Sequence, residues 1–262
     1  MPATYAHGVY GKNVLNVLDE KTKVLIQKYR NLYDIGCSGP DILFFYRPLK
    51  SNAIRKLGDD IHQVPARDFF MRARTLMRTS SNPDAALVYV LGFIYHIELV
   101  SECHPKVSQD ERDTGVSHSE IESELDALLM REDGLDPIRT RACDHIVFNH
   151  QDCKIIAPFF GLTPNEIKES MNTMKLFLNF FVAPSEIKRK FIFGVMKKVN
   201  MYDHYHGLIF NREVNPISAP TCAWLREHMD LAVEASVRLI NEYQKTLETE
   251  QILDERYDRT YE

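Results

Sequence analysis

The chain has 262 residues, of which 44% are hydrophobic, and a net charge of −5. This length suits one large domain or two small ones, and the composition is that of a globular protein with a sizeable core. The mildly negative charge argues against a nucleic-acid partner, because surfaces that bind nucleic acid are basic. The longest apolar run covers residues 85–95. It is too short to cross a bilayer, which takes about 20 residues, so we expect no transmembrane segment.

Apolar residues recur at helical spacing along most of the chain. The expected helices cover residues 8–34, 52–62, 67–78, 117–131, 138–150, 163–181, 184–199 and 221–251. Asn82 and Pro83 open a further helix that is apolar nearly all round and should lie in the middle of the fold, with His96 at its far end. Residues 105–116 are expected to be a charged linker. No strand-like alternation occurs, so we predict a single all-α domain over residues 1–262 with nine or ten helices.

The cysteines and the first residues of the chain indicate the cellular compartment of the protein. Five cysteines occur at irregular spacings, with no CxxC pair: Cys37, Cys103, Cys143, Cys153 and Cys222. The first residues lead straight into a polar, helix-like pattern and lack the features of a secretory signal. Such cysteines without such a signal are typical of reduced thiols. We therefore expect a cytoplasmic protein.

Residues 117–122 contain a histidine and a carboxylate at a spacing that could hold a metal ion. Ser117 and Glu120 have the spacing of a capping box, which predicts that a helix begins here. His118 and Glu122 are four residues apart and so lie on one face of that helix. Imidazole and carboxylate are side chains that hold zinc. A His–Glu pair at this spacing is more often a solvated pair, so the interpretation needs further ligands.

Two histidines upstream, His96 and His104, are eight residues apart. A helix between them would rise roughly 12 Å, whereas each ligand of one zinc must reach it at about 2 Å. These two histidines should therefore serve different metals. His104 then joins His118 and Glu122.

More residues of ligand type lie along the first half of the chain. In order, the motifs are His7 in His-x-x-Tyr-Gly, Gly39-Pro40-Asp41 followed by Phe44-Phe45-Tyr46, Gly58-x-x-x-His62, Gly92-Phe93-Ile94-Tyr95-His96, His104-Pro105 and His118-x-x-x-Glu122. Their order and spacing resemble the zinc-dependent phospholipase C family, in the intracellular branch found in Gram-positive bacteria. The resemblance covers residues 1–130, which carry the ligand motifs, and residues 131–262 are a helical remainder.

The resemblance implies an all-α fold of the zinc-dependent phospholipase C and zinc nuclease type, with up to three zinc ions in a cleft. The implied ligands are His7 for one ion, Asp41, His62 and His96 for a second, and His104, His118 and Glu122 for a third. The implied reaction is hydrolysis of a phosphodiester, with a small phosphodiester or a phospholipid headgroup as substrate and Asp41 orienting or deprotonating the attacking water. Zinc suits this chemistry because it lowers the pKa of bound water and stabilises charge on phosphoryl oxygens.

One position departs from the family pattern. The family has an aspartate that bridges two ions four residues after the histidine equated with His96, and this chain has Val100 there. Valine binds no metal, and two cations roughly 3.5–4 Å apart repel each other without an anion between them. Glu98 and Glu102 are close in sequence but should point away from His96 on a regular helix. We therefore expect two zinc ions at most. The alternative function is a zinc-stabilised binding or regulatory protein that has lost the reaction.

Three smaller features leave alternatives open. Cys103 shares a helix face with His96 and could be a soft ligand, although a buried inert thiol is commoner. His204 and His206 could form a small separate metal site, although ordinary solvated histidines are the commoner case. The aromatic run 44–46 should pack in the core rather than contact a membrane. We find no lipid-docking module or amphipathic membrane helix in the sequence.

Overall fold

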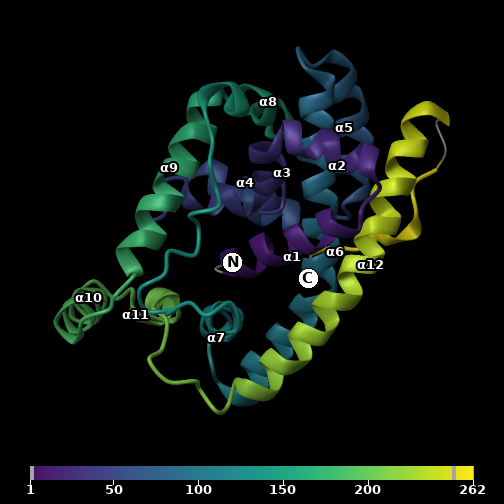
Figure 1. Ribbon diagram of the computed structural model, residues 1–262. Coiled ribbons are helices and arrows are strands. Elements are labelled where there is room, and N and C mark those ends of the chain that lie inside the picture. Colours follow the sequence, from purple (N-terminus) through teal and green to yellow (C-terminus); the bar gives the residue numbers. More distant parts are fainter. Residues whose placement is uncertain (1–2, 250–251, 262) are drawn as a thin grey trace. The chain divides into compact units, whose positions relative to one another are not determined.

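The computed structural model describes residues 3–249 and 252–261, and all regular elements in these residues are helices (Figure 1). The all-α prediction is therefore confirmed. The chain groups into two compact units. The smaller unit comprises Met1–Ala6, Cys103–Asp144 and Lys175–His228. The larger unit comprises His7–Glu102, His145–Met174 and Met229–Glu262.

Most helices follow one another through short connections, and a longer one, residues 133–149, joins α7 to α8 (Figure 1). The α-helices are α1 Thr4–Val17, α2 Glu20–Lys28, α3 Arg30–Gly36, α4 Ala53–His62, α5 Arg67–Thr79, α6 Pro83–Thr114, α7 His118–Glu132, α8 His150–Phe160, α9 Pro164–Phe181, α10 Glu186–Lys198, α11 Tyr202–Tyr205 and α12 Ala219–Thr249. The 3-10 helices are η1 Gly39–Phe45, η2 His206–Leu208 and η3 Glu255–Asp258. Four boundaries between the two units fall inside α1, α6, α9 and α12, and a fifth falls between Asp144 and His145, outside any helix.

Several helix starts follow from capping residues that the sequence already displayed. The side chain of Asn82 accepts a hydrogen bond from the N–H of Ala85 at the start of α6. At the start of α9 the Thr163 hydroxyl accepts from the N–H of Glu166, whose carboxylate accepts from the N–H of Thr163. Both predicted starts are confirmed.

Three predicted segments are wrong. Residues 105–116 are not a linker, because α6 continues to Thr114 with Pro105 inside it. Residues 8–34 are not one helix, because Asp19 caps α2 by accepting from the N–H of Thr22 and so ends α1. Residues 138–150 form turns, and the helix of that region is α8, which begins after a capping box on Asn149.

The part of α6 that belongs to the larger unit is almost entirely buried over residues 85–100. It packs closely on α3, where a Cβ added to Gly36 or Gly92 would lie 2.3 Å from a backbone oxygen of the other helix. Only glycine permits that approach. Among the described helices, α6 alone is long and apolar enough to cross a membrane, yet 83% of its most apolar window is buried inside the protein. The described residues thus contain no clear transmembrane segment.

Two other sequence predictions concern burial. All five cysteines are buried and free of disulfides, as expected. In the aromatic run, Phe45 and Tyr46 are buried, which confirms that the run packs in the core. The smaller unit has a core of its own in which α10 buries one face. It consists of Phe181, Ala183, Ile192, Met196 and Ile209.

Candidate metal centres

Three predicted histidine ligands lie around one buried carboxylate, the predicted ligand Asp41, in the larger unit. His62 Nε2 is 3.1 Å from Asp41 Oδ1, and His96 Nε2 is 3.8 Å from the same oxygen. His7 Nε2 is 3.9 Å from Asp41 Oδ2. Ligand atoms of His7, Asp41 and His96 all lie within 4.8 Å of one another. We call these four residues the Asp41 cluster. The resemblance implied a separate ion for His7, whereas the structure groups His7 with Asp41 and His96.

The hydrogen bonds of this cluster favour a cation at its centre. His62 Nδ1 lies 2.7 Å from the carbonyl oxygen of Gly58, and His96 Nδ1 lies 3.1 Å from that of Cys37. A carbonyl oxygen only accepts, so each Nδ1 carries the hydrogen and donates it. In a neutral imidazole, Nε2 then presents a lone pair to the Asp41 carboxylate, and two acceptors face each other. A metal ion between them makes this arrangement favourable, and metal-binding histidines are commonly oriented by such bonds.

Burial and charge set the protonation of the Asp41 cluster. Burial lowers the pKa of His96 to about 3, so this imidazole is neutral at physiological pH. Burial also opposes ionisation of Asp41, but a positive charge on His96 and a hydrogen bond donated by His62 would outweigh it and hold the pKa of that carboxyl below its usual range. An ionised carboxylate and a neutral imidazole are the forms that bind metal. Among the described residues, none hydrogen-bonds to the buried His96 Nε2.

The backbone on both sides of Asp41 is shaped for this approach. Gly39 begins η1 with a φ of +52°, in the left-handed region that favours glycine. A Cβ at this position would lie 2.2 Å from Cδ2 of His96. The glycine of the Gly39-Pro40-Asp41 motif therefore lets η1 lie directly against the His96 ring.

Tyr261 covers the Asp41 cluster, and sequence reasoning missed it. Its ring centroid is 4.6 Å from that of His62 and 5.8 Å from that of His96, and its N–H donates to the His62 carbonyl. The tyrosine is fully buried, and its hydroxyl has no hydrogen-bond partner among the described residues. A single tyrosine that is distant in sequence from His62 and His96 gives no sequence signal that it contacts them. The segment after α12 therefore helps to enclose the cluster.

The second candidate centre lies in the smaller unit and matches the set predicted from spacing. His104 Nε2 is 3.5 Å from Glu122 Oε1, and His118 Nε2 is 3.2 Å from the same oxygen. The ligand atoms of all three residues lie within 4.8 Å of one another. The side chain of Glu122 is buried, whereas that of His118 is 27% exposed. We call this set the Glu122 cluster; solvent reaches it from the side of His118.

Charge in the Glu122 cluster also suits a cation. Burial opposes ionisation of Glu122, but His118 and His104 outweigh it and hold the pKa of Glu122 well below its usual range. Burial would lower the pKa of His118, but the carboxylate of Glu122 outweighs this effect and raises it. The second oxygen of Glu122, Oε2, is buried and lacks a hydrogen-bond partner among the described residues. An ionised, incompletely satisfied carboxylate beside two imidazoles fits a metal ion.

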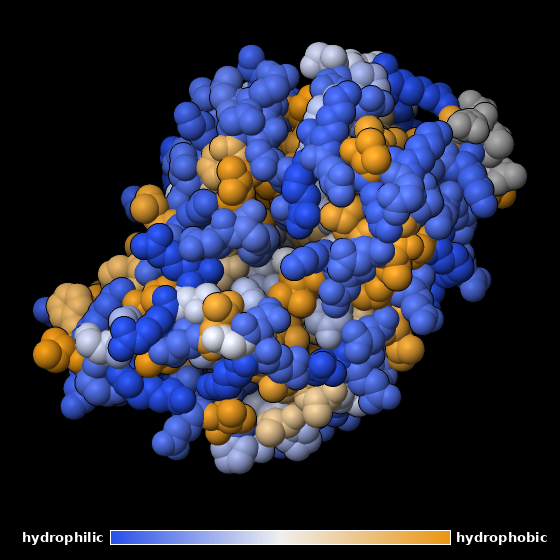
Figure 2. Space-filling model, in the orientation of Figure 1, coloured by the Kyte–Doolittle hydropathy of each residue, from blue (hydrophilic) through white to orange (hydrophobic). Residues whose placement is uncertain are grey.

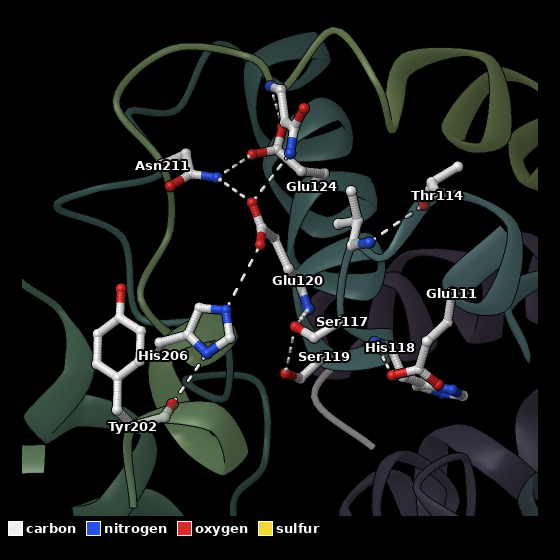
Figure 3. Close-up of polar contacts among 12 residues, drawn as sticks. Glu111, Thr114, Ser117, His118, Ser119, Glu120, Glu124, Tyr202, His206 and Asn211 are labelled. Carbon is white, nitrogen blue, oxygen red and sulfur yellow. Dashed lines mark hydrogen bonds and ion pairs between the residues drawn. The ribbon is translucent and has the colours of Figure 1, made fainter. Parts of the chain in front are cut away.

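Helix α7 presents an acidic pair on one face and a histidine–carboxylate pair on the opposite face. The Ser117 hydroxyl accepts from the N–H of Glu120 and caps the helix, as predicted. Two residues of a helix turn the direction by about 200°, so Glu120 and Glu124 face away from His118 and Glu122. The side-chain amide of Asn211 donates to both Glu120 and Glu124 (Figure 3). This network holds α7 in the orientation that turns His118 and Glu122 towards His104.

The remaining candidates take no part in either cluster. Neither Cys103 nor the pair His204 and His206 belongs to a metal-binding group in the part of the chain that the structure describes. His206 Nε2 instead lies 3.6 Å from Glu120 Oε2, and His206 Nδ1 donates to the Tyr202 carbonyl (Figure 3).

Glu98 and Glu102 are turned towards arginines rather than towards His96. Glu98 pairs with Arg256, and Glu102 Oε2 lies 3.2 Å from Arg259 Nη1. Val100, at the position that the resemblance equates with a bridging aspartate, is buried. These pairings agree with the expectation that Glu98 and Glu102 point away from His96.

Comparisons of the chain with protein-family models, with curated proteins and with solved structures find no match. The two candidate centres thus rest on this chain's own geometry. The geometry establishes two groups of buried or partly buried histidine and carboxylate side chains. Each group could hold a metal ion.

Proposed function

We propose that the chain is a zinc-dependent hydrolase of phosphodiester bonds, similar in chemistry to phospholipase C. The observation that carries the proposal is the Glu122 cluster, which combines two imidazoles, one ionised carboxylate and a solvent-facing side at His118. Catalytic zinc sites have three protein ligands of these types and leave a further position for water or substrate. Zinc at such a site lowers the pKa of water and stabilises charge on phosphoryl oxygens.

The residues of the two clusters would have different roles in binding metal and substrate. Glu122 and His104, the more buried members, would anchor the ion, while His118 would lie on the side from which a phosphodiester approaches. The Asp41 cluster would bind a second ion more tightly enclosed by protein. The role of Asp41 in orienting or deprotonating the attacking water stays a prediction. The carboxylate oxygens of Asp41 already face three imidazoles.

A second candidate function is a zinc-stabilised binding or regulatory protein without the reaction. Two observations favour it. Val100 is buried and provides no carboxylate beside His96, and Tyr261 packs on His62 and His96 over the Asp41 cluster. Metal ions enclosed in this way would stabilise the fold rather than contact a substrate.

Hydrolysis of p-nitrophenyl phosphorylcholine by the zinc-loaded protein would separate the two functions. We expect turnover that a chelator abolishes and that His118→Ala lowers about 100-fold or more, because the solvent-facing ligand is lost. His204→Ala is the matched control, since His204 is exposed and belongs to neither cluster. Failure of the zinc-loaded protein on a broad phosphodiester panel would refute the hydrolase. If Val100→Asp then created activity, only the bridging carboxylate was missing.

The two clusters should release zinc at different pH values. An imidazole must lose its proton before it binds zinc. Glu122 raises the pKa of His118 above 6.5 against the effect of burial, whereas burial lowers the pKa of His96 to about 3. As the pH falls, protons therefore displace zinc from the Glu122 cluster first. Zinc retained per chain after dialysis from about pH 8 to about pH 5 should fall in two steps. Loss of all zinc in a single step would contradict this order.

A further inference from the structure

Helix α10 of the smaller unit exposes a stripe of large apolar side chains. Ile187 is 83% exposed, Phe191 64% and Val195 45%. These residues are four apart, so they lie along one face of the helix. Single exposed apolar residues are common on proteins, but a contiguous row of them marks an interaction surface.

The stripe is not the face by which α10 packs on the protein. Ile192 and Met196, on the opposite side, are buried in the core of the smaller unit. The helix is thus apolar on two faces, and the fold covers one. A helix of this kind in water is expected to have a partner for its second face.

Exposed apolar side chains also lie at the end of α9. Leu176 and Phe180, which are four residues apart, are both exposed there. The ammonium group of Lys188 lies 5.7 Å from the centre of the Phe180 ring, which places the end of α9 beside the start of α10. In the part of the view where Figure 1 draws α10, Figure 2 shows several hydrophobic residues interspersed with hydrophilic ones.

Charge around the stripe identifies its partner. Helix α10 carries five basic residues and one acidic residue, whereas the whole chain has a net charge of −5. Lys190 and Lys198 are exposed, and no ion pair joins either of them to an acidic residue in the described ranges. Exposed apolar side chains with lysines beside them are the pattern of helices that lie in the surface of an anionic membrane.

We propose that the α10 stripe, Ile187, Phe191 and Val195 with Lys190 and Lys198 beside it, docks the protein on anionic lipid membranes. The apolar side chains enter the boundary between headgroups and acyl chains, and the lysines extend to the lipid phosphates. A second copy of the chain fits less well, because a two-fold contact through this face would bring its lysines together. The proposal is independent of the metal clusters and of the proposed hydrolase.

Sedimentation with lipid vesicles tests the proposal. The zinc-loaded protein should bind vesicles that contain phosphatidylglycerol far more strongly than pure phosphatidylcholine vesicles, and salt at about 1 M should weaken that binding. The double change Ile187→Asp and Phe191→Asp should lower the affinity tenfold or more. Changing Lys190 and Lys198 to Glu should lower it about 25-fold or more, because each basic residue near the membrane contributes about fivefold.

Matched controls come from exposed residues on other helices. Val24→Asp on α2 and Lys154→Glu on α8 introduce the same changes of side chain at exposed sites, and both should leave binding unchanged. Circular dichroism would establish that every variant is folded. Equal binding to neutral and anionic vesicles, or α10 variants that bind like the unaltered protein, would overturn the proposal. So would a dimer in sedimentation velocity that dissociates in the aspartate variant without any vesicle binding.

Discussion

Removal of metal with a chelator should lower the melting temperature by roughly 8–15 °C for each ion lost. An ion present at about a thousand times its dissociation constant contributes about 4 kcal/mol, which corresponds to a shift of this size in a chain of this length. The physical reason lies in the buried carboxylates. Glu122 Oε2 lacks a hydrogen-bond partner among the described residues, and the buried Asp41 carboxylate lies beside three imidazoles. Differential scanning calorimetry with and without chelator measures the effect.

Two substitutions test whether the metal ions of the two clusters stabilise the fold. Glu122→Gln and Asp41→Asn each remove the charge of one cluster, so each should lower the zinc content from about two ions per chain to about one. Adding zinc back should restore the melting temperature of the chelated protein, and magnesium, which prefers oxygen ligands, should not. An untreated protein that contains no zinc by elemental mass spectrometry, and that melts at the same temperature as the chelated protein, would refute both metal centres.

Arg256→Ala should lower the free energy of unfolding by about 3–5 kcal/mol. Glu98 is 1% exposed and pairs with Arg256, so loss of the guanidinium leaves a buried carboxylate without its counter-charge. The arginine also fastens the segment that carries Tyr261 onto α6. The variant should therefore lose zinc from the Asp41 cluster to a chelator faster than the unaltered protein does. Urea denaturation and the rate of zinc release give the two readouts.

The neighbouring pair is a matched control for this prediction. Glu102 and Arg259 join the same two segments, but both side chains are partly exposed. Arg259→Ala should therefore cost at most about 1 kcal/mol. Adding Glu98→Gln to the Arg256→Ala variant should recover part of the loss, because a neutral amide is less costly to bury than an unpaired carboxylate. Equal, small losses for Arg256→Ala and Arg259→Ala would contradict the account of the buried pair.

Local patterns in the sequence were sufficient for most helices. Caps are interactions between residues two or three apart, so Ser117, Thr163 and Asn82 predicted the starts of α7, α9 and α6. The pairing of His118 with Glu122 followed from helical spacing for the same reason. The break at Asp19 and the continuation of α6 through Pro105 were missed, since a capping residue or a proline acts on the backbone only in the context that tertiary packing provides.

The sequence by itself determined the class of fold and the residue types that could hold a metal. Only the tertiary structure decided which of them meet. His7 joins Asp41, Tyr261 covers His62, and Glu98 turns to Arg256 because contacts between distant segments depend on how helices pack, which no spacing along one helix encodes. The stripe on α10 escaped notice for a related reason. Its apolar residues occupy two faces, and only packing shows which face the core covers.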